Sequence, residues 1–335
     1  MSDTLGDRMK LYEGMEAGRR LMPLLPALAR IDGRAFHSFT RGMDRPFDAR
    51  FSACMVDTTL ALVRDTGACM GYTQSDEITL AWHSRTTQSQ IWFDGRVAKM
   101  TSQLAAQATL IFYRLVLDRM PEYAVRLPTF DARVWNVPSR AEGANVFLWR
   151  EWDATKNSVN MAASAYYSHK ALIGRNSPQK HDMLLAKGVN WNDYPPLFKR
   201  GAYVQRRTVV KPFSADELDR LPPKHEARTN PALVVERSVC SVLDMPPLGS
   251  VTNREAVIFD GALPELETAH LDSVIACLED DAAFLRNQIA DSEIATNMEK
   301  AAKLLRAPRG EDERRRSALT LPRGNAVADP DHGAV

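Results

Sequence analysis

The chain has 335 residues, 44% of them hydrophobic and 25% charged, which is typical of a globular protein with one large core or two smaller ones. No apolar run approaches the roughly 20 residues that a membrane-spanning helix needs, so we expect no membrane partner. Lys and Arg number 43 against 42 Asp and Glu, and this net charge of +1 neither requires nor excludes a nucleic-acid partner.

The N-terminus and the cysteines indicate the compartment. Residues 1–10 are charged and lack an apolar stretch, so they do not form a secretory signal. Cys54, Cys69, Cys240 and Cys277 lie far apart, which argues against a zinc cluster and against a disulfide framework. We therefore expect a cytoplasmic protein.

The first 140 residues alternate between predicted strands and helices. Ala27 to Asp32 is a short apolar run closed by Gly33, which predicts a strand followed by a turn. Asp48 to Asp65 has apolar residues at helical spacing and is followed by Gly67, a helix stop.

A β-hairpin and a second helix–strand pair follow. Cys69 to Thr73 and Ile78 to Trp82 are predicted strands on either side of the polar tip 74–77. Arg96 to Arg119 lacks Gly and Pro and is predicted helical, and Phe130 to Val137 is a fourth strand. The order strand, helix, strand, strand, helix, strand predicts an α+β fold of the ferredoxin-like type, an antiparallel sheet with helices on one face.

The rest of the chain has weaker signals. Ala144 to Tyr167 is predicted helical from about Trp152, Gly201 to Val210 and Val234 to Leu243 are predicted strands, and Leu263 to Arg306 predicts one or two helices. We expect four regions: a catalytic domain over 1–140, a basic RNA-facing segment over 141–250 that continues it, an acidic helical part over 251–306, and a disordered tail over 307–335.

The positions of the acids are the most informative feature. Asp32 ends the first strand and Asp76 lies at the hairpin tip, and these strands are neighbours in a ferredoxin-like sheet. Two carboxylates and the Gly33 carbonyl are hard oxygen ligands that suit Mg²⁺, and shared carboxylates can hold two ions about 4 Å apart. The alternative is an ordinary Asp-Gly turn and an ordinary polar tip.

Basic side chains suggest a phosphate site. Arg96 and Lys99 lie at i and i+3 in the first turn of a helix, so both can reach one polyphosphate. The alternative is a solvated helix start, which is the usual explanation for basic residues considered alone. Arg34, Arg41 and Arg45 add positive charge after the Asp-Gly turn.

A basic stretch suggests an RNA partner. Residues 174–211 contain eight Lys and Arg against two Asp, with Trp191 and Tyr194 available for stacking on bases. The candidate phosphate-backbone contacts are Lys187, Lys199, Arg200, Arg206 and Arg207. A solvated loop-and-strand surface is the alternative.

Four ordered motifs between residues 27 and 139 resemble those of a known family. Residues 30–37 read R-I-D-G-R-A-F-H, residues 72–77 read Y-T-Q-S-D-E, residues 96–99 have the form R-x-x-K, and F-D-A-R at 130–133 precedes P-S at 138–139. The sequence is thereby similar to the tRNA(His) guanylyltransferase family, whose members extend RNA in the 3'-5' direction.

The resemblance implies a site. Asp32 and Asp76 would bridge two Mg²⁺ ions with the Gly33 carbonyl as a further ligand, and Arg96 and Lys99 would hold a triphosphate. The nucleotide pocket for GTP or ATP would be lined by Asp32, Gly33, Arg34, Ala35, Phe36, His37, Ser75 and Asp76.

The resemblance also implies a reaction. The 5'-phosphate of a tRNA is activated with ATP or GTP, and the 3'-hydroxyl of an incoming GTP or other nucleotide then attacks it, usually in a homo-oligomer (a dimer or tetramer). Of the family's eukaryotic H-I-N-N-L-Y-N motif only Asn157 is present, and Arg45 to Asp48 replaces K-P-N-D. The pattern looks more like the bacterial, archaeal and phage proteins that repair truncated tRNA 5' ends.

Two other functions fit parts of this pattern. One is a non-catalytic nucleotide sensor with the same fold, which has little need for both Asp32 and Asp76. The other is a nucleotidyl cyclase-like enzyme, which would not need the basic stretch 174–211.

Overall fold

The computed structural model describes residues 4–87, 90–230, 232–266, 268–288 and 293–306. Two compact units divide the chain, Met1–Glu265 and Leu266–Val335. The predicted tail, 307–335, lies outside the described residues. In the described ranges no helix is long and apolar enough to cross a membrane, and the four cysteines are unpaired.

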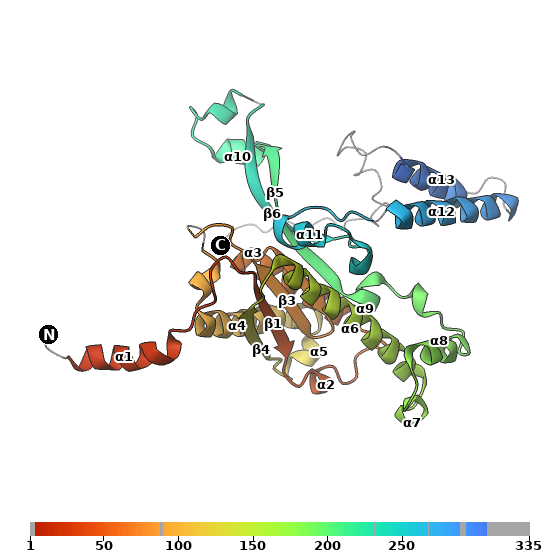
Figure 1. Cartoon of the computed structure of the whole chain (residues 1–335), viewed down its shortest axis with the longest axis horizontal. Helices are drawn as coiled ribbons and strands as arrows, with labels where there is room; N and C mark the ends of the chain where they lie inside the picture. Colours follow the sequence, from red (N-terminus) through yellow and green to blue (C-terminus); the bar gives the residue numbers. More distant parts are fainter. Residues whose placement is uncertain (1–3, 88–89, 231, 267, 289–292, 307–335) are drawn as a thin grey trace. The chain divides into compact units, whose positions relative to one another are not determined.

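Helices, short 3-10 turns (η) and strands alternate along the chain (Figure 1). In order they are α1 (Leu5–Ala17), β1 (Ala27–Gly33), α2 (Phe36–Phe39), α3 (Ala49–Thr66), β2 (Met70–Gln74), β3 (Glu77–Trp82), η1 (Trp92–Gly95), α4 (Val97–Arg119), α5 (Pro121–Ala124), β4 (Phe130–Asn136), α6 (Arg140–Tyr166), α7 (His169–Leu172), α8 (Ser177–Leu185), η2 (Trp191–Asp193), α9 (Pro196–Arg200), β5 (Ala202–Pro212), α10 (Ala215–Arg220), η3 (Glu226–Arg228), β6 (Val234–Leu243), η4 (Leu248–Ser250), α11 (Arg254–Asp260), α12 (Thr268–Gln288) and α13 (Glu293–Arg306).

The strands form one antiparallel sheet in the order β4-β1-β3-β2-β5-β6. Its first four strands, with α3 and α4 as the crossovers, make the ferredoxin-like arrangement, so the predicted fold class is confirmed. The later strands extend this sheet, because Ala202 to Gln205 of β5 pair with β2. From Arg206 onward β5 pairs only with β6, and this two-stranded ribbon extends beyond the sheet (Figure 1).

The sheet has one helical layer on each face. Ala29 and Ile31 of β1 point into the main hydrophobic core, which they share with Leu62 of α3 and Phe112 of α4. Alternate residues of a strand point to opposite faces, so Arg30 lies on the other face, the one that α6 covers. The predicted helices on one face are thus α3 and α4, and α6 covers the second face.

Local sequence signals explain where the helices begin. Asp48 caps α3 by accepting hydrogen bonds from the backbone N–H groups of Arg50 and Phe51, and Gly67 ends the helix at φ +67°. Helix α6 begins at Arg140, twelve residues before the predicted start, because the Ser139 side chain accepts from the Glu142 N–H. Ser followed three residues later by Glu is a helix-start pattern that apolar periodicity does not reveal.

The second unit contains two helices, as the sequence predicted for part of 263–306. Helices α12 and α13 pack against each other, with Ile275, Ala282, Ala295 and Ala302 buried.

Candidate functional site

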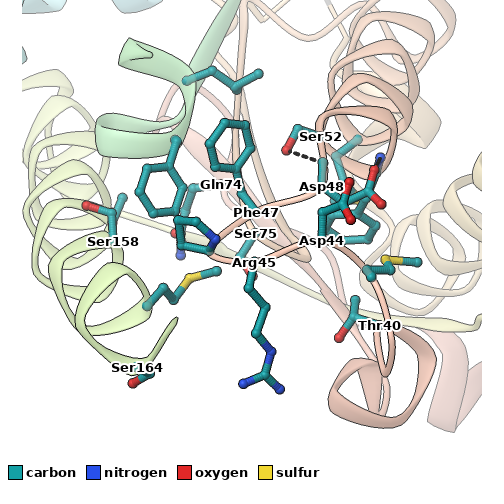
Figure 2. Close-up of a pocket in the computed structure, with 18 of the residues that line it drawn as sticks. Thr40, Asp44, Arg45, Phe47, Asp48, Ser52, Gln74, Ser75, Ser158 and Ser164 are labelled. Atoms are coloured by element: carbon teal, nitrogen blue, oxygen red, sulfur yellow. Dashed lines mark hydrogen bonds between the residues drawn. The ribbon is translucent and has the colours of Figure 1, made fainter. Parts of the chain in front are cut away.

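A cavity of about 380 Å³ lies between the loop before α3 and helix α6. Figure 2 shows Ser52 of α3 on one side, Ser158 of α6 on the other and Phe47 between them. The ring of Phe47 stacks on Phe198 with ring centroids 4.8 Å apart. Apolar walls with a few polar groups, at this volume, are typical of small-molecule sites.

Two predicted nucleotide residues, His37 and Ser75, line this cavity. Asp48 lines it as well, but its carboxylate is held by the Arg50 guanidinium and by the backbone at the start of α3. The hydrogen bond from Arg50 lowers the pKa of Asp48, so this group stays an anion at the cavity wall.

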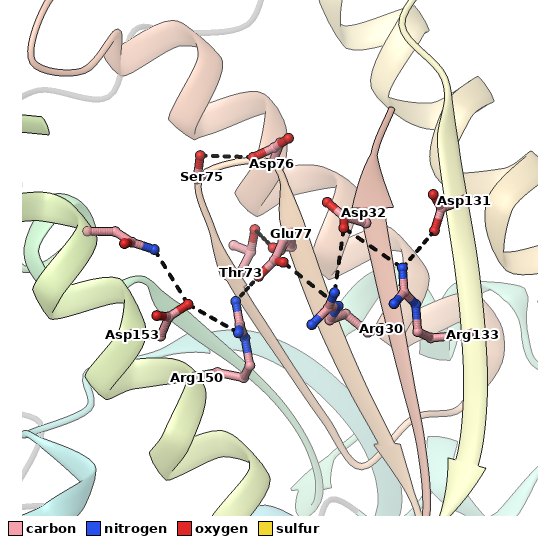
Figure 3. A network of polar contacts seen from close by, with 11 residues as sticks. Arg30, Asp32, Thr73, Ser75, Asp76, Glu77, Asp131, Arg133, Arg150 and Asp153 are labelled. Carbon is pink, nitrogen blue, oxygen red and sulfur yellow. Dashed lines mark hydrogen bonds and ion pairs between the residues drawn. The ribbon is translucent and has the colours of Figure 1, made fainter. Parts of the chain in front are cut away.

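The predicted carboxylates meet at the end of the sheet. The Gly33 N–H donates to the Asp76 carbonyl at 3.0 Å, and Asp32 is the cross-strand partner of Glu77. Asp32 and Asp76 line a second cavity of about 300 Å³, into which Ser75 also faces (Figure 3). The two cavities therefore meet at the hairpin tip, where Ser75 lines both.

Local backbone geometry positions these groups. Ser75 adopts φ +49°, which lets the two-residue turn Ser75–Asp76 close the hairpin. A Cβ on Gly33 would lie 2.5 Å from the Phe36 ring, so only glycine fits beside that buried side chain.

The electrostatics of Asp76 suit a cation. Burial, and secondarily the negative charge of Asp32, raise the pKa of Asp76. A divalent cation between the two would relieve this repulsion, and the Gly33 carbonyl adds a third hard oxygen. Among the described residues no three His, Cys, Asp or Glu side chains cluster as a metal site, so the donor set that fits Mg²⁺ is two carboxylates and one backbone carbonyl.

A network of ion pairs lies next to the hairpin tip Ser75–Asp76 (Figure 3). Arg150 of α6 is 4% exposed and forms ion pairs with Glu77 and with Asp153. Arg30 lies 3.8 Å from Glu77 and 3.7 Å from Asp32. Glu77 therefore serves as the partner of arginines on two elements.

Helix α6 contributes site residues that the sequence analysis did not assign. Arg150, Asp153, Asn157 and Asn160 all line the cavity that contains the carboxylates. Their spacing of three, four and three residues puts them on one helix face. The single retained family residue, Asn157, was the available signal for this face.

Three predicted nucleotide residues next to Gly33 differ in their exposure. Arg34 and Ala35 are exposed, and Ala35 adopts φ +55°. The Phe36 side chain is 3% exposed and packs on Phe112 and Phe130, so only its backbone is available to a nucleotide.

The structure does not bring Arg96 and Lys99 to the carboxylates of the same chain. The Phe130 N–H donates to Thr109 of α4, and Phe130 is the cross-strand partner of Gly33. At about 1.5 Å per residue, Lys99 lies about 15 Å and Arg96 about 20 Å along the helix from Thr109. Their predicted triphosphate would be a different one from that held at Asp32.

The cations of the predicted RNA segment do not form one open surface. Arg206 and Arg207 follow each other in β5 and so face opposite ways. Contacts within the protein engage Lys187 (over the Tyr167 ring), Lys199 (to the Asn192 carbonyl), Arg200 (to the Met245 carbonyl) and Arg206 (to the Ala68 carbonyl).

The aromatic rings of that segment are also engaged. The Trp191 indole N–H donates to Ser158 at 3.1 Å. Tyr194 packs edge-on against Phe198, with ring centroids 5.0 Å apart. Base stacking on either ring thus requires displacement of these contacts.

Comparison with known proteins shows which proteins this chain is similar to. Residues 6–138 match the model of the tRNA(His) guanylyltransferase family. A bacterial tRNA(His) guanylyltransferase-like protein solved in complex with ATP is 31% identical, with a TM-score of 0.62 over 76% of this chain and 99% of that chain. A second such structure, in complex with GTP, is 30% identical, with a TM-score of 0.57 over 74% and 94%. The tRNA(His) guanylyltransferase of Schizosaccharomyces pombe is 27% identical over 62% of this chain and 83% of its own.

Proposed function

The chain belongs to the tRNA(His) guanylyltransferase family of nucleotidyltransferases, and on this basis we propose that it adds GMP or other nucleotides to the 5' end of a tRNA in the 3'-5' direction. The observation that carries the proposal is that Asp32 and Asp76 line one cavity, beside Gly33, and that Ser75 lines both this cavity and the larger one.

The two cavities are suited to the two parts of a nucleotide. The apolar walls around Phe47 and Phe198 suit a purine base, and the cavity with Asp32 and Asp76 suits metal-bound phosphates. Ser75, at the boundary, would contact the sugar or the α-phosphate. The bacterial relatives bound to ATP and GTP support a nucleoside triphosphate as the ligand.

Each chemical step displaces a phosphate-linked leaving group. In the first, an oxygen of the tRNA 5'-phosphate attacks the α-phosphorus of ATP and pyrophosphate leaves. In the second, the 3'-hydroxyl of GTP attacks the activated 5' phosphorus and AMP leaves. Asp32, Asp76 and the Gly33 carbonyl would hold Mg²⁺, which when bound supplies neutralisation of phosphate charge and activation of the attacking oxygen.

The residues around the tip orient the reactants. The Arg150–Glu77 pair fixes the hairpin against α6, so Asp76 keeps its position as charge develops on the phosphates. Arg96 and Lys99 remain proposed ligands of a triphosphate, one that lies away from the carboxylates of the same chain.

The α6 sequence favours repair of truncated tRNA 5' ends over strict tRNA(His) guanylylation, because the anticodon-linked motif is reduced to Asn157. We propose a homo-oligomer, which the exposed apolar side chains of α1 support: Leu5, Met9, Leu11, Tyr12 and Met15. Since tRNA and nucleoside triphosphates are both present in the cytoplasm, we propose that compartment.

The proposal is tested with intact and 5'-truncated tRNAs, each labelled nucleotide in turn, and Mg²⁺. We expect 5' addition that Asp32→Asn and Asp76→Asn reduce by at least about a thousandfold, because each removes one of the proposed metal-binding carboxylates. Asp131→Asn is the matched control, since Asp131 lies opposite Asp32 on β4 but is exposed and paired with Arg133. Full activity in both site variants would rule out the mechanism, and no addition to any tRNA by the unmodified protein would rule out the function.

A further inference from the structure

A third hollow lies on the other side of the segment that follows Gly33. It is a groove of about 530 Å³, lined by Arg34, Ala35, Ser38, Phe39, Arg41, Arg126, Leu127, Pro128 and Thr129. The backbone N–H of Arg34 donates to the Thr129 carbonyl at 2.9 Å and ties its two walls together. We propose that this groove binds a backbone phosphate of the RNA substrate, an inference that rests on the function proposed above.

The charge of the groove favours an anion. Three guanidinium groups line it and no carboxylate does. Neither Arg34 nor Arg41 has a hydrogen bond or ion pair from its guanidinium to any residue in the described part of the chain, and both are exposed. A chain with a net charge of only +1 thus concentrates positive charge beside its carboxylates.

The third arginine is fixed in place. The Arg126 guanidinium donates to the carbonyls of Phe39 at 2.5 Å and Arg41 at 2.6 Å, and it lies over the Tyr123 ring. It therefore holds the 38–41 turn that carries Arg41 and keeps its own charge in the groove. One fixed guanidinium beside two that are open to solvent is an arrangement that suits phosphate oxygens.

The groove favours RNA phosphate over the triphosphate of a nucleotide. The groove has three arginines and no carboxylate that could hold a metal ion, and a phosphodiester carries one charge, which arginine alone can balance. The groove also begins one residue from Gly33, so an RNA strand whose 5' end lies at Asp32 can reach it.

The test compares two variants of the full chain with unmodified protein. Arg41→Gln removes one cation, but Arg41 also lines the 380 Å³ cavity. Ser38→Glu therefore adds an anion at a residue that lines the groove and not that cavity. Arg114→Gln is the matched control, because Arg114 is an exposed arginine of α4 that lines neither hollow. The readouts are the Kd for a 5'-phosphorylated tRNA as a function of salt, and the Kd values for ATP and GTP.

We expect Arg41→Gln and Ser38→Glu to weaken tRNA binding about tenfold near 0.1 M salt. The negative slope of the logarithm of the association constant against the logarithm of the salt concentration should become less steep by about one. Nucleotide affinity of Ser38→Glu and all affinities of Arg114→Gln should match unmodified protein. Unchanged tRNA binding in both variants, while unmodified protein still extends tRNA, would refute the groove alone. A parallel loss of ATP affinity in Ser38→Glu would reassign the groove to the nucleotide. If unmodified protein neither binds nor extends tRNA, both proposals fail.

Discussion

Asp76 is an anion in surroundings that disfavour its charge. Burial and the neighbouring Asp32 raise its pKa, and the Ser75 hydroxyl, which donates to the carboxylate at 3.0 Å, only partly compensates. The ionised form therefore destabilises the fold of the metal-free protein, as expected where carboxylates are placed for ligand binding and not for stability.

The direction of the Asp76 pKa shift predicts how the Asp76→Asn substitution changes stability at neutral pH. The pKa of Asp76 is raised in the folded state, so the protonated carboxyl contributes favourably to the free energy of unfolding. This contribution is complete below the unfolded-state pKa of about 3.9 and is lost as the pH rises through the folded-state pKa. We expect Asp76→Asn to raise the Tm at pH 7.5 in the absence of divalent cations, and the increase to shrink as the pH falls toward 4.

Thermal unfolding with and without Mg²⁺ measures the effect of the Asp76 charge and the effect of the cation on the Tm. Mg²⁺ should raise the Tm of unmodified protein more than that of Asp76→Asn, because a ligand that binds only the folded state stabilises it. Asp131→Asn, whose carboxylate lies beside Arg133, should not raise the Tm. A lower Tm for Asp76→Asn at pH 7.5 would contradict the prediction.

At the scale of elements, one ion pair joins α6 to the sheet. Arg150 is 4% exposed and Glu77 17%, so the pair between them is largely shielded from water. Removal of Arg150 leaves the Glu77 carboxylate with Arg30, 3.8 Å away, as its remaining partner. Loss of one partner of a buried pair costs about 3–5 kcal/mol, whereas loss of both costs less.

We therefore expect Arg150→Met to lower the free energy of unfolding by about 3 kcal/mol, and Glu77→Gln combined with Arg150→Met to recover part of that loss. Arg133→Gln, which breaks the exposed pair with Asp131 and the 4.0 Å ion pair with Asp32, should cost under about 1 kcal/mol. Denaturant unfolding of the four proteins gives these values. Equal losses for Arg150→Met and Arg133→Gln would show that the buried pair does not hold α6.

At the scale of the whole molecule, the sheet, the main core and all three hollows lie in unit Met1–Glu265. The second unit has its own helix pair, with buried side chains between α12 and α13. Nothing in the proposed site requires a residue beyond Glu265.

A chain that ends after Glu265 should therefore fold and keep its nucleotide-addition activity within about twofold of full length, since domains with their own core generally fold alone. Circular dichroism and the tRNA extension assay check this expectation. An aggregated or inactive truncated protein would mean that the helical unit contributes to the catalytic one.

Strand and helix order was predictable because the elements of the first 140 residues have periodic apolar patterns and explicit stops. Gly33, Gly67 and Pro138 mark ends that agree with the structure to within a residue or two. The early start of α6 was missed because its N-terminal third is apolar around most of its circumference, and the signal at Ser139 and Glu142 depends on capping, not on periodicity.

The amino-acid order alone predicted the arrangement of the first four strands and that Asp32 and Asp76 lie at the same end of the sheet, because short strands joined by tight turns have few alternative arrangements. Only the tertiary structure decided which other side chains lie beside Asp32 and Asp76. It brought Arg150 and Asn157 there from α6, and it left Arg96 at the far end of α4. It also collected Arg34, Arg41 and Arg126 into one groove. Such groupings depend on the angle at which helices lie across a sheet. Side-chain packing over the whole core sets that angle, and a local sequence pattern does not.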